Sequence, residues 1–177
     1  MNIYTGKDLA RSFREVRGNT ITIAEEIPDS QYAFQAAAET RSVARLLAHI
    51  ALAPGFQLYT HGNRIADLKA VNFGELLTRA ASEEAQPRTK EEILALLRAE
   101  GDKFATFVEG LSDAFLAERV TMPPGAQPTS KSRLEMLMSP KEHEMHHRAQ
   151  LMLVQRMLGL VPHLTRRQQE QFARPRQ

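Results

Sequence analysis

The chain of 177 residues contains no cysteine, which excludes disulfides, thiolate metal ligands and a cysteine nucleophile. Any thiol chemistry would therefore need a thiol supplied by a substrate or cosubstrate. No apolar stretch approaches the roughly 18–20 residues that a membrane-spanning helix needs, and the N-terminus lacks the basic start and apolar run of a signal peptide. The sequence predicts a cytoplasmic protein without a membrane partner.

The positive charge of the chain is concentrated at its C-terminal end. The net charge is +2, but residues 165–177 alone carry +3 and residues 1–164 carry −1. Neither a clustered basic patch nor a base-stacking motif is visible, so the sequence does not indicate a nucleic-acid partner. We expect a single domain over residues 1–164, followed by a polar, basic and flexible tail over residues 165–177.

Apolar residues recur at helical spacing along most of the chain. The predicted helices cover residues 9–27, 40–53, 73–81, 89–111, 130–138 and 141–160. No segment longer than four residues alternates between apolar and polar side chains as a half-buried strand would. The sequence therefore predicts an all-α protein, with four main helices in an antiparallel bundle.

Two capping patterns mark helix starts. Thr89 and Glu92 form a capping box. Ser139 and Glu142 form a second such pattern around Pro140, so either a new helix begins there or one long helix continues with a kink. We favour the continuous, kinked helix. Gly101 lies inside the helix predicted for residues 89–111, at a cost of about 1 kcal/mol relative to alanine.

Three histidines indicate a metal site. His143 and His147 are four residues apart, so both imidazoles project from one helix face, and two neutral imidazoles bind a divalent metal at about 2.0–2.1 Å each. His49 lies among apolar residues of another helix; alone, it fits a core histidine that is hydrogen-bonded to a neighbour. Together, three histidines with an open fourth position are typical of a catalytic metal site.

The other histidines fit less specific roles. His146 points about 100° away from His147 around the helix and is expected to be solvated. His61 lies in a predicted turn at residues 60–63 and is expected to be exposed, whereas His163 is expected to cap or pack. Residues 56–70 and 122–128 are the segments that we expect at the rim of a substrate pocket.

The run from His143 to His147 also matches the H-E-x-x-H motif of zinc proteases, with Glu144 as the general base. The chain shows no sheet to hold a peptide, and no glycine and third histidine follow at the extended motif's spacing. The only glutamate downstream is Glu170, which lies in the polar tail. These features disfavour a protease.

Two segments resemble the DinB-like superfamily of damage-inducible, YfiT-type metal proteins: Leu46-Leu47-Ala48-His49-Ile50-Ala51, and the run from Glu142 to Leu151. The resemblance extends over most of the chain and implies an up-down-down-up four-helix bundle with short extra helices in the connections, often as a homodimer. It also implies that His49, His143 and His147 bind the metal. Ala149 stands where the family usually has glycine.

For the activity, the resemblance implies a metal-dependent transferase that acts on a small-molecule substrate with a low-molecular-weight thiol as cosubstrate. One alternative is a hydrolase that uses metal-bound hydroxide, with Glu144 or Glu142 assisting. The other is a non-enzymatic stress-response bundle in which the metal is structural. Zinc or nickel is the expected divalent metal, with iron as a further candidate, and no catalytic residue is assigned.

Overall fold

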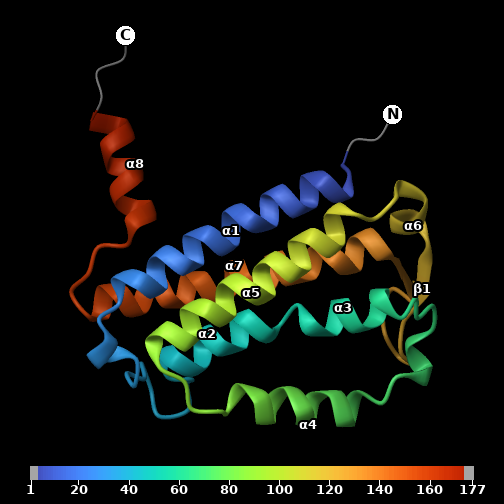
Figure 1. Ribbon diagram of the computed structural model, residues 1–177, viewed down its shortest axis with the longest axis horizontal. Helices are drawn as coiled ribbons and strands as arrows, with labels where there is room; N and C mark the ends of the chain where they lie inside the picture. The colour runs from blue at the N-terminus through green and yellow to red at the C-terminus, as the bar shows by residue number, and fades with distance from the viewer. Residues whose placement is uncertain (1–3, 174–177) are drawn as a thin grey trace.

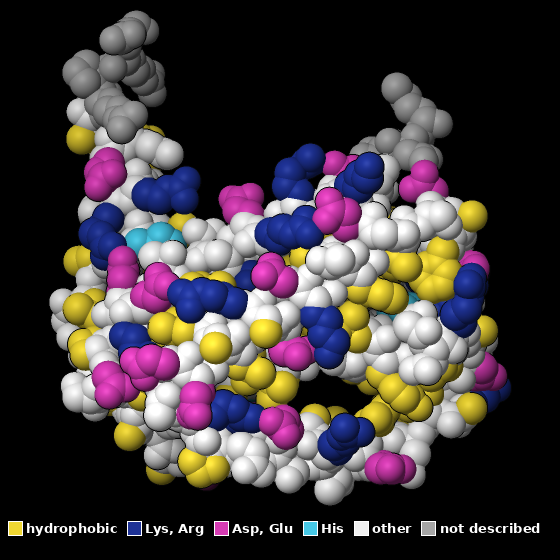
Figure 2. Space-filling view, viewed as in Figure 1, with side chains coloured by type: hydrophobic (Ala, Val, Ile, Leu, Met, Phe, Trp, Pro, Cys, Tyr) yellow, Lys and Arg dark blue, Asp and Glu magenta, His cyan; other side chains and the backbone are white. Residues whose placement is uncertain are grey.

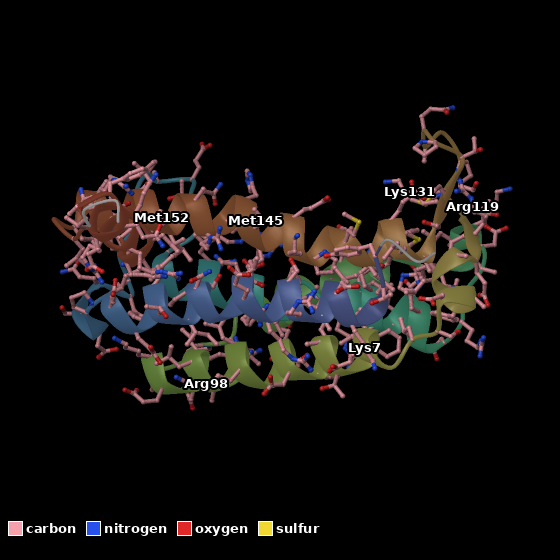
Figure 3. The ribbon with its side chains drawn as sticks, turned by 90° about the horizontal axis from the view of Figure 1, so that it is seen from above. Lys7, Arg98, Arg119, Lys131, Met145 and Met152 are labelled. Atoms are coloured by element: carbon pink, nitrogen blue, oxygen red, sulfur yellow. The ribbon has the colours of Figure 1, made fainter. Side chains whose placement is uncertain are left out.

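The computed structural model describes residues 4–173, which form a four-helix bundle (Figure 1). Its long helices are α1 (Gly6–Glu26), α2 (Val43–Leu52) continued by α3 (Gly55–Gly62), α5 (Lys90–Glu109) and α7 (Arg133–Met157). In the view from above, α1 lies between α7 and α5 (Figure 3). α2 packs against α5 and α7, which closes the bundle.

Short elements occupy the connections. They are the 3₁₀ turns η1 (Asp29–Gln31) and η2 (Leu68–Ala70), the helices α4 (Phe73–Glu84), α6 (Asp113–Ala117) and α8 (His163–Ala173), and the strands β1 (Arg119–Thr121) and β2 (Ser130–Ser132). The two strands pair antiparallel. This hairpin is a departure from the all-helical expectation, because residues 130–132 were predicted to begin a helix.

The helix directions follow from the path of α4. α1 runs one way along the bundle and α2 with α3 returns; α4 then carries the chain back along the outside, so that α5 runs in the same direction as α2 (Figure 1). α7 finally runs parallel to α1. The predicted up-down-down-up bundle is confirmed, and α2 and α7 become antiparallel neighbours.

The core is built from the predicted apolar helix faces. One buried cluster joins the ends of α1, α2, α5 and α7 around Leu47, Ile50 and Leu97. A second joins Phe13 of α1 and Phe104 of α5, whose ring centroids lie 4.8 Å apart. These apolar side chains leave water on folding, which is the main stabilising contribution in a domain of this size.

The junction around Pro140 belongs to one continuous helix, as we favoured. Pro140 lies inside α7, and the helix begins at Arg133, after the N-cap Ser132, whose side chain forms the capping box with Glu135. The alternative, a new helix capped by Ser139, is therefore excluded. The predicted capping box of Thr89 and Glu92 is confirmed at the start of α5.

The C-terminal segment differs in part from its prediction. Residues that we expected in a flexible tail form α8, which projects away from the bundle (Figure 1); residues 174–177 lie outside the described part of the chain. The mobility of the tail and the domain boundary at residue 164 stay predictions.

Within residues 4–173, no helix combines the length and apolar character that crossing a membrane requires.

Candidate metal centre

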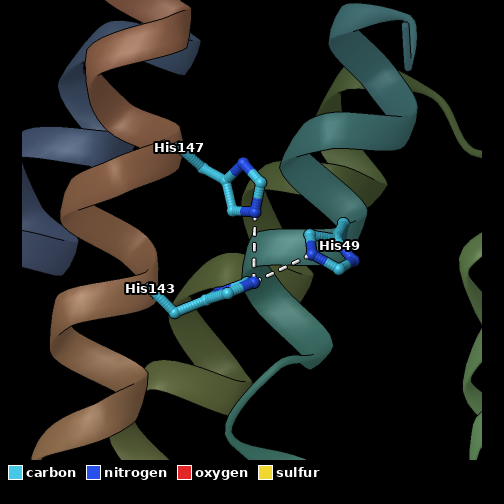
Figure 4. Close-up of side chains that lie close together, drawn as sticks. All are labelled: His49, His143 and His147. Atoms are coloured by element: carbon cyan, nitrogen blue, oxygen red, sulfur yellow. Dashed lines mark hydrogen bonds between the residues drawn. The ribbon is translucent and has the colours of Figure 1, made fainter. Parts of the chain in front are cut away.

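The three predicted ligands converge on one point between α2 and α7 (Figure 4). The Nε2 atom of His143 lies 3.0 Å from Nε2 of His49 and 3.1 Å from Nε2 of His147. Two ligands that each bind a tetrahedral metal at about 2.0–2.1 Å are separated by roughly 3.3 Å. These two separations are close to that value, and all three ligand nitrogens lie within 4.8 Å of one another.

Helix geometry and the fold each supply part of this arrangement. His143 and His147 lie on successive turns of α7 and share a face because they are four residues apart. His49 lies on α2, which is a direct neighbour of α7 in the bundle. The site therefore depends on a local spacing and on one helix–helix contact.

The outer nitrogens of two histidines are held by oxygen acceptors. Nδ1 of His49 donates to Oε2 of Glu84 at 2.8 Å, and Nδ1 of His147 donates to Oε1 of Gln150 at 2.8 Å. These bonds place the hydrogen on Nδ1 and leave the Nε2 lone pairs directed at the centre of the cluster. Such outer partners orient the imidazoles of histidine metal sites and fix their tautomer.

Glu84 is itself fixed by a cation. Its Oε1 atom accepts a hydrogen bond from Nε of Arg41 at 2.6 Å, and the carboxylate is buried. Burial alone would favour the neutral acid, but the hydrogen bonds from Arg41 and His49 hold the pKa of Glu84 below its ordinary value. The carboxylate stays charged and remains an acceptor for His49.

Burial lowers the pKa of all three clustered histidines. The pKa of His143 falls to about 4, because of burial and then the neighbouring His147 and His49. Burial is also the largest cause of the lower pKa of His49 and of His147. The rings are neutral at pH 7, which is the form that binds metal. The three nitrogen donors, the tautomers of His49 and His147 and the neutral state of the rings therefore fit a divalent metal ion.

Glu144 does not face this cluster. It is 1% exposed, and both of its oxygens accept hydrogen bonds from Nε of Arg17, at 2.9 and 3.0 Å. A buried carboxylate bound to a guanidinium is a poor proton acceptor for a reaction at the metal centre. The expectation that Glu144 acts as a general base or assists the reaction is therefore wrong.

Two of the remaining histidines follow their predictions. His146 is exposed, and His163 packs, with Nε2 donating to Oδ1 of Asn19 at 3.2 Å. The expectation for His61 was wrong. It lies in α3 with 1% exposure, because its ring bridges Gln57 and the buried Arg133.

A cavity of about 300 Å³ lies along α7, on the side of the cluster toward the start of that helix, and none of the three clustered histidines lines it. Ser139, one helical turn before His143 on the same face, and Glu142 line it together with Gln57 of α3. The segments expected at a pocket rim also contribute, through Phe56, Leu68, Met122 and Pro123. Glu142 forms no hydrogen bond or ion pair with another residue in the range 4–173, so its carboxylate is available to a ligand.

A family model settles the relationship that the histidines suggest. The model of the DinB superfamily matches residues 12–151, which include all three clustered histidines. The chain belongs to the DinB superfamily. No curated protein sequence matches it.

Solved DinB-like structures share the fold. YfiT from Bacillus subtilis, described as a probable metal-dependent hydrolase with an unusual four-helix bundle topology, has a TM-score of 0.68 at 14% identity; the match covers 90% of this chain and 91% of YfiT. The DinB-like protein YjoA from Bacillus subtilis has a TM-score of 0.60 at 20% identity and 85% and 92% coverage. An uncharacterised protein from Clostridium difficile 630 has a TM-score of 0.67 at 12% identity, with 88% and 98% coverage.

The sequence did not reveal the partners of the DinB histidine cluster. The contact between Gln150 and His147 could have been predicted from the sequence, because Gln150 lies three residues after His147 on the same helix. The contact between Glu84 and His49 could not be predicted from the sequence, because the two residues are 35 positions apart. They come together only because α4 runs back along the outside of the bundle.

Proposed function

We propose that this DinB protein binds a divalent metal through His49, His143 and His147 and uses it for catalysis on a small-molecule substrate. The observation that carries the proposal is the convergence of the three Nε2 atoms, of which two belong to rings fixed by acceptors on Nδ1. Three histidines leave one or more positions of the metal open. When bound, a divalent metal supplies a Lewis acid that lowers the pKa of a coordinated water or thiol.

Hydrolysis is the reaction class that the site supports best. Glu142 directly precedes His143 in the chain, lines the cavity along α7 and has no partner among the described residues, so we assign to it the transfer of a proton to or from the substrate. The fold relative YfiT is described as a probable metal-dependent hydrolase, which supports this choice. The apolar walls from Phe56 and Met136 would exclude water from part of the substrate.

Thiol transfer is the second candidate. The chain has no cysteine, so a low-molecular-weight thiol would have to enter the cavity as a cosubstrate and reach the open metal position. The same three histidines serve both reactions, and the identity of the nucleophile separates them. Zinc and nickel are the metals that we propose, with iron as the third.

Metal content tests the ligand set. We expect about one equivalent of metal in the wild type and a loss of at least tenfold in affinity in His143→Ala. His146→Ala is the matched control, because His146 lies on the same helix but outside the cluster. Equal metal content in the wild type and His143→Ala would contradict the proposal.

The reaction class is tested with a cobalt-substituted protein. A visible spectrum that changes on adding a small thiol supports transferase chemistry, whereas an unchanged spectrum combined with ester or amide hydrolysis that is lost in Glu142→Gln supports the hydrolase. If the protein shows neither response and unfolds when the metal is removed, the metal is structural.

Light scattering tests the predicted homodimer.

A further inference from the structure

The helix α4 is held to the bundle at its two ends. At its start, the ring of Phe73 packs against Phe56 with centroids 5.7 Å apart. At its end, Glu84 accepts hydrogen bonds from Arg41 and His49. Among the residues of α4, only Glu84 is buried. The middle of this helix therefore spans the side of the bundle without packing closely onto it.

The apolar side of α4 is packed only in part: Phe73 and Leu76 contact the small core cluster around Leu68 and Met136, and the same side of the helix borders a hollow. Leu76, Leu77 and Ala80 line this hollow from α4, and Leu77 is 68% exposed. The opposite wall includes Leu52 of α2 and Leu96 of α5. Figure 2 shows an opening above α4, with hydrophobic side chains along part of its edge. An amphipathic helix normally buries such a face, so a ligand that fills the hollow would gain hydrophobic free energy.

The volume of the hollow is that of a small-molecule binding site. It is about 680 Å³, within the range of roughly 300–1,000 Å³ that is typical of small-molecule sites. A single extended hydrocarbon chain belongs to this size class of ligand, and its apolar surface matches the leucine-lined walls.

The charged residues at the rim of the hollow favour a ligand with an anionic group. Glu83 pairs with Arg88, and Glu100 pairs with Lys103 at 3.5 Å. Arg79 also lines the hollow, but it forms no hydrogen bond or ion pair with any residue in the described range 4–173. The two acidic side chains are thus neutralised, and one cation is left to meet a negative group of the ligand.

We propose that this hollow binds a single-chain amphipathic carboxylate, with its hydrocarbon chain between α4 and α5 and its carboxylate at Arg79. The hollow shares Phe56 and Phe73 with the cavity along α7, but the proposal does not depend on a bound metal, because Arg79 and the leucines that it invokes are not among the clustered histidines. It adds a second ligand site to the one that the histidines form.

Calorimetry on the full-length metal-loaded protein tests the apolar part with octanoate, decanoate and dodecanoate below their micellar concentrations. We expect each added CH₂ group to tighten binding by up to about fourfold until the hollow is filled. Ala80→Trp, which places a large ring in the hollow, should weaken decanoate binding at least tenfold. The matched control is Ala81→Trp, on the next residue, which is also exposed but does not line the hollow; it should bind decanoate as the wild type does.

The anionic part is tested by Arg79→Ala and by decanol, which has the same chain without the charge. Decanoate should bind several-fold more weakly to the variant, and decanol equally to both proteins. Equal decanoate binding by Ala80→Trp and Ala81→Trp, or unchanged decanoate binding by Arg79→Ala, would overturn the proposal. So would light scattering that shows a wild-type dimer and a monomeric Ala80→Trp, because a second copy would then cover the hollow.

Discussion

Arg17 and Glu144 form a buried ion pair at the centre of the bundle, 4% and 1% exposed. The guanidinium also donates to the carbonyl oxygens of Leu97 at 2.7 Å and Ile50 at 3.1 Å. Glu144 follows His143 and Ile50 follows His49 in the sequence. One arginine thus ties together α1, α2, α5 and α7 directly beside two of the clustered histidines.

Removing the carboxylate should destabilise the fold. Glu144→Ala leaves Arg17 buried without a counter-charge, and we expect a loss of about 3–5 kcal/mol in the free energy of unfolding. Urea denaturation of the metal-free protein measures it. Glu142→Ala, on the exposed carboxylate two residues earlier, should change stability by less than about 0.5 kcal/mol. Equal stability of the two variants would contradict a structural role for the ion pair.

Gly101 should resist replacement although it lies inside a helix. A Cβ atom there would lie 2.9 Å from Cγ of Arg17, so Gly101→Ala should destabilise the protein by about 1–3 kcal/mol through overpacking. Gly18 in α1 has nothing within 4 Å of its Cβ position, and Gly18→Ala should stabilise by up to about 1 kcal/mol. Thermal unfolding compares the two; a stabilised Gly101→Ala would refute this reading of the contact.

Glu84 should strengthen metal binding without touching the metal. Glu84→Gln removes the charged acceptor of His49, and we expect metal affinity to fall by about 10–100-fold. Glu83→Gln is the matched control, because the neighbouring carboxylate pairs with Arg88 and not with a clustered histidine. Competition with a chromogenic chelator measures both affinities, and equal values would exclude a role for Glu84.

Acid should destabilise the protein partly through His61. Burial, and then the charge of Arg133, lowers the pKa of His61 to about 4, against about 6.5 in the unfolded chain. The unfolded state therefore binds the extra proton first, and His61 contributes stability above pH 6.5 that is lost as the pH falls from 6.5 toward 4. In chelator, His61→Gln should lower the slope of unfolding free energy against pH near pH 5 by up to about 1.4 kcal/mol per pH unit. An unchanged slope would contradict this assignment.

Local patterns predicted most of the helices, and their limits are visible at particular residues. The capping box at Thr89 and Glu92 could be predicted from the sequence, because its hydrogen bonds join residues that are only three positions apart. The burial of His61 could not, since its partner Arg133 is 72 residues away. α7 begins at Arg133 and not at residue 130, because residues 130–132 pair with β1 instead of entering the helix.

The sequence by itself determined the helical periodicity, the absence of thiol ligands and the shared face of His143 and His147, because each is a property of neighbouring residues. Only the tertiary structure decided that His49 meets this pair, that Glu84 orients His49, and that Glu144 turns inward to Arg17. Those outcomes depend on how α2, α4 and α7 pack. Helix packing sums many weak contacts between distant segments, and no single stretch of sequence encodes that sum.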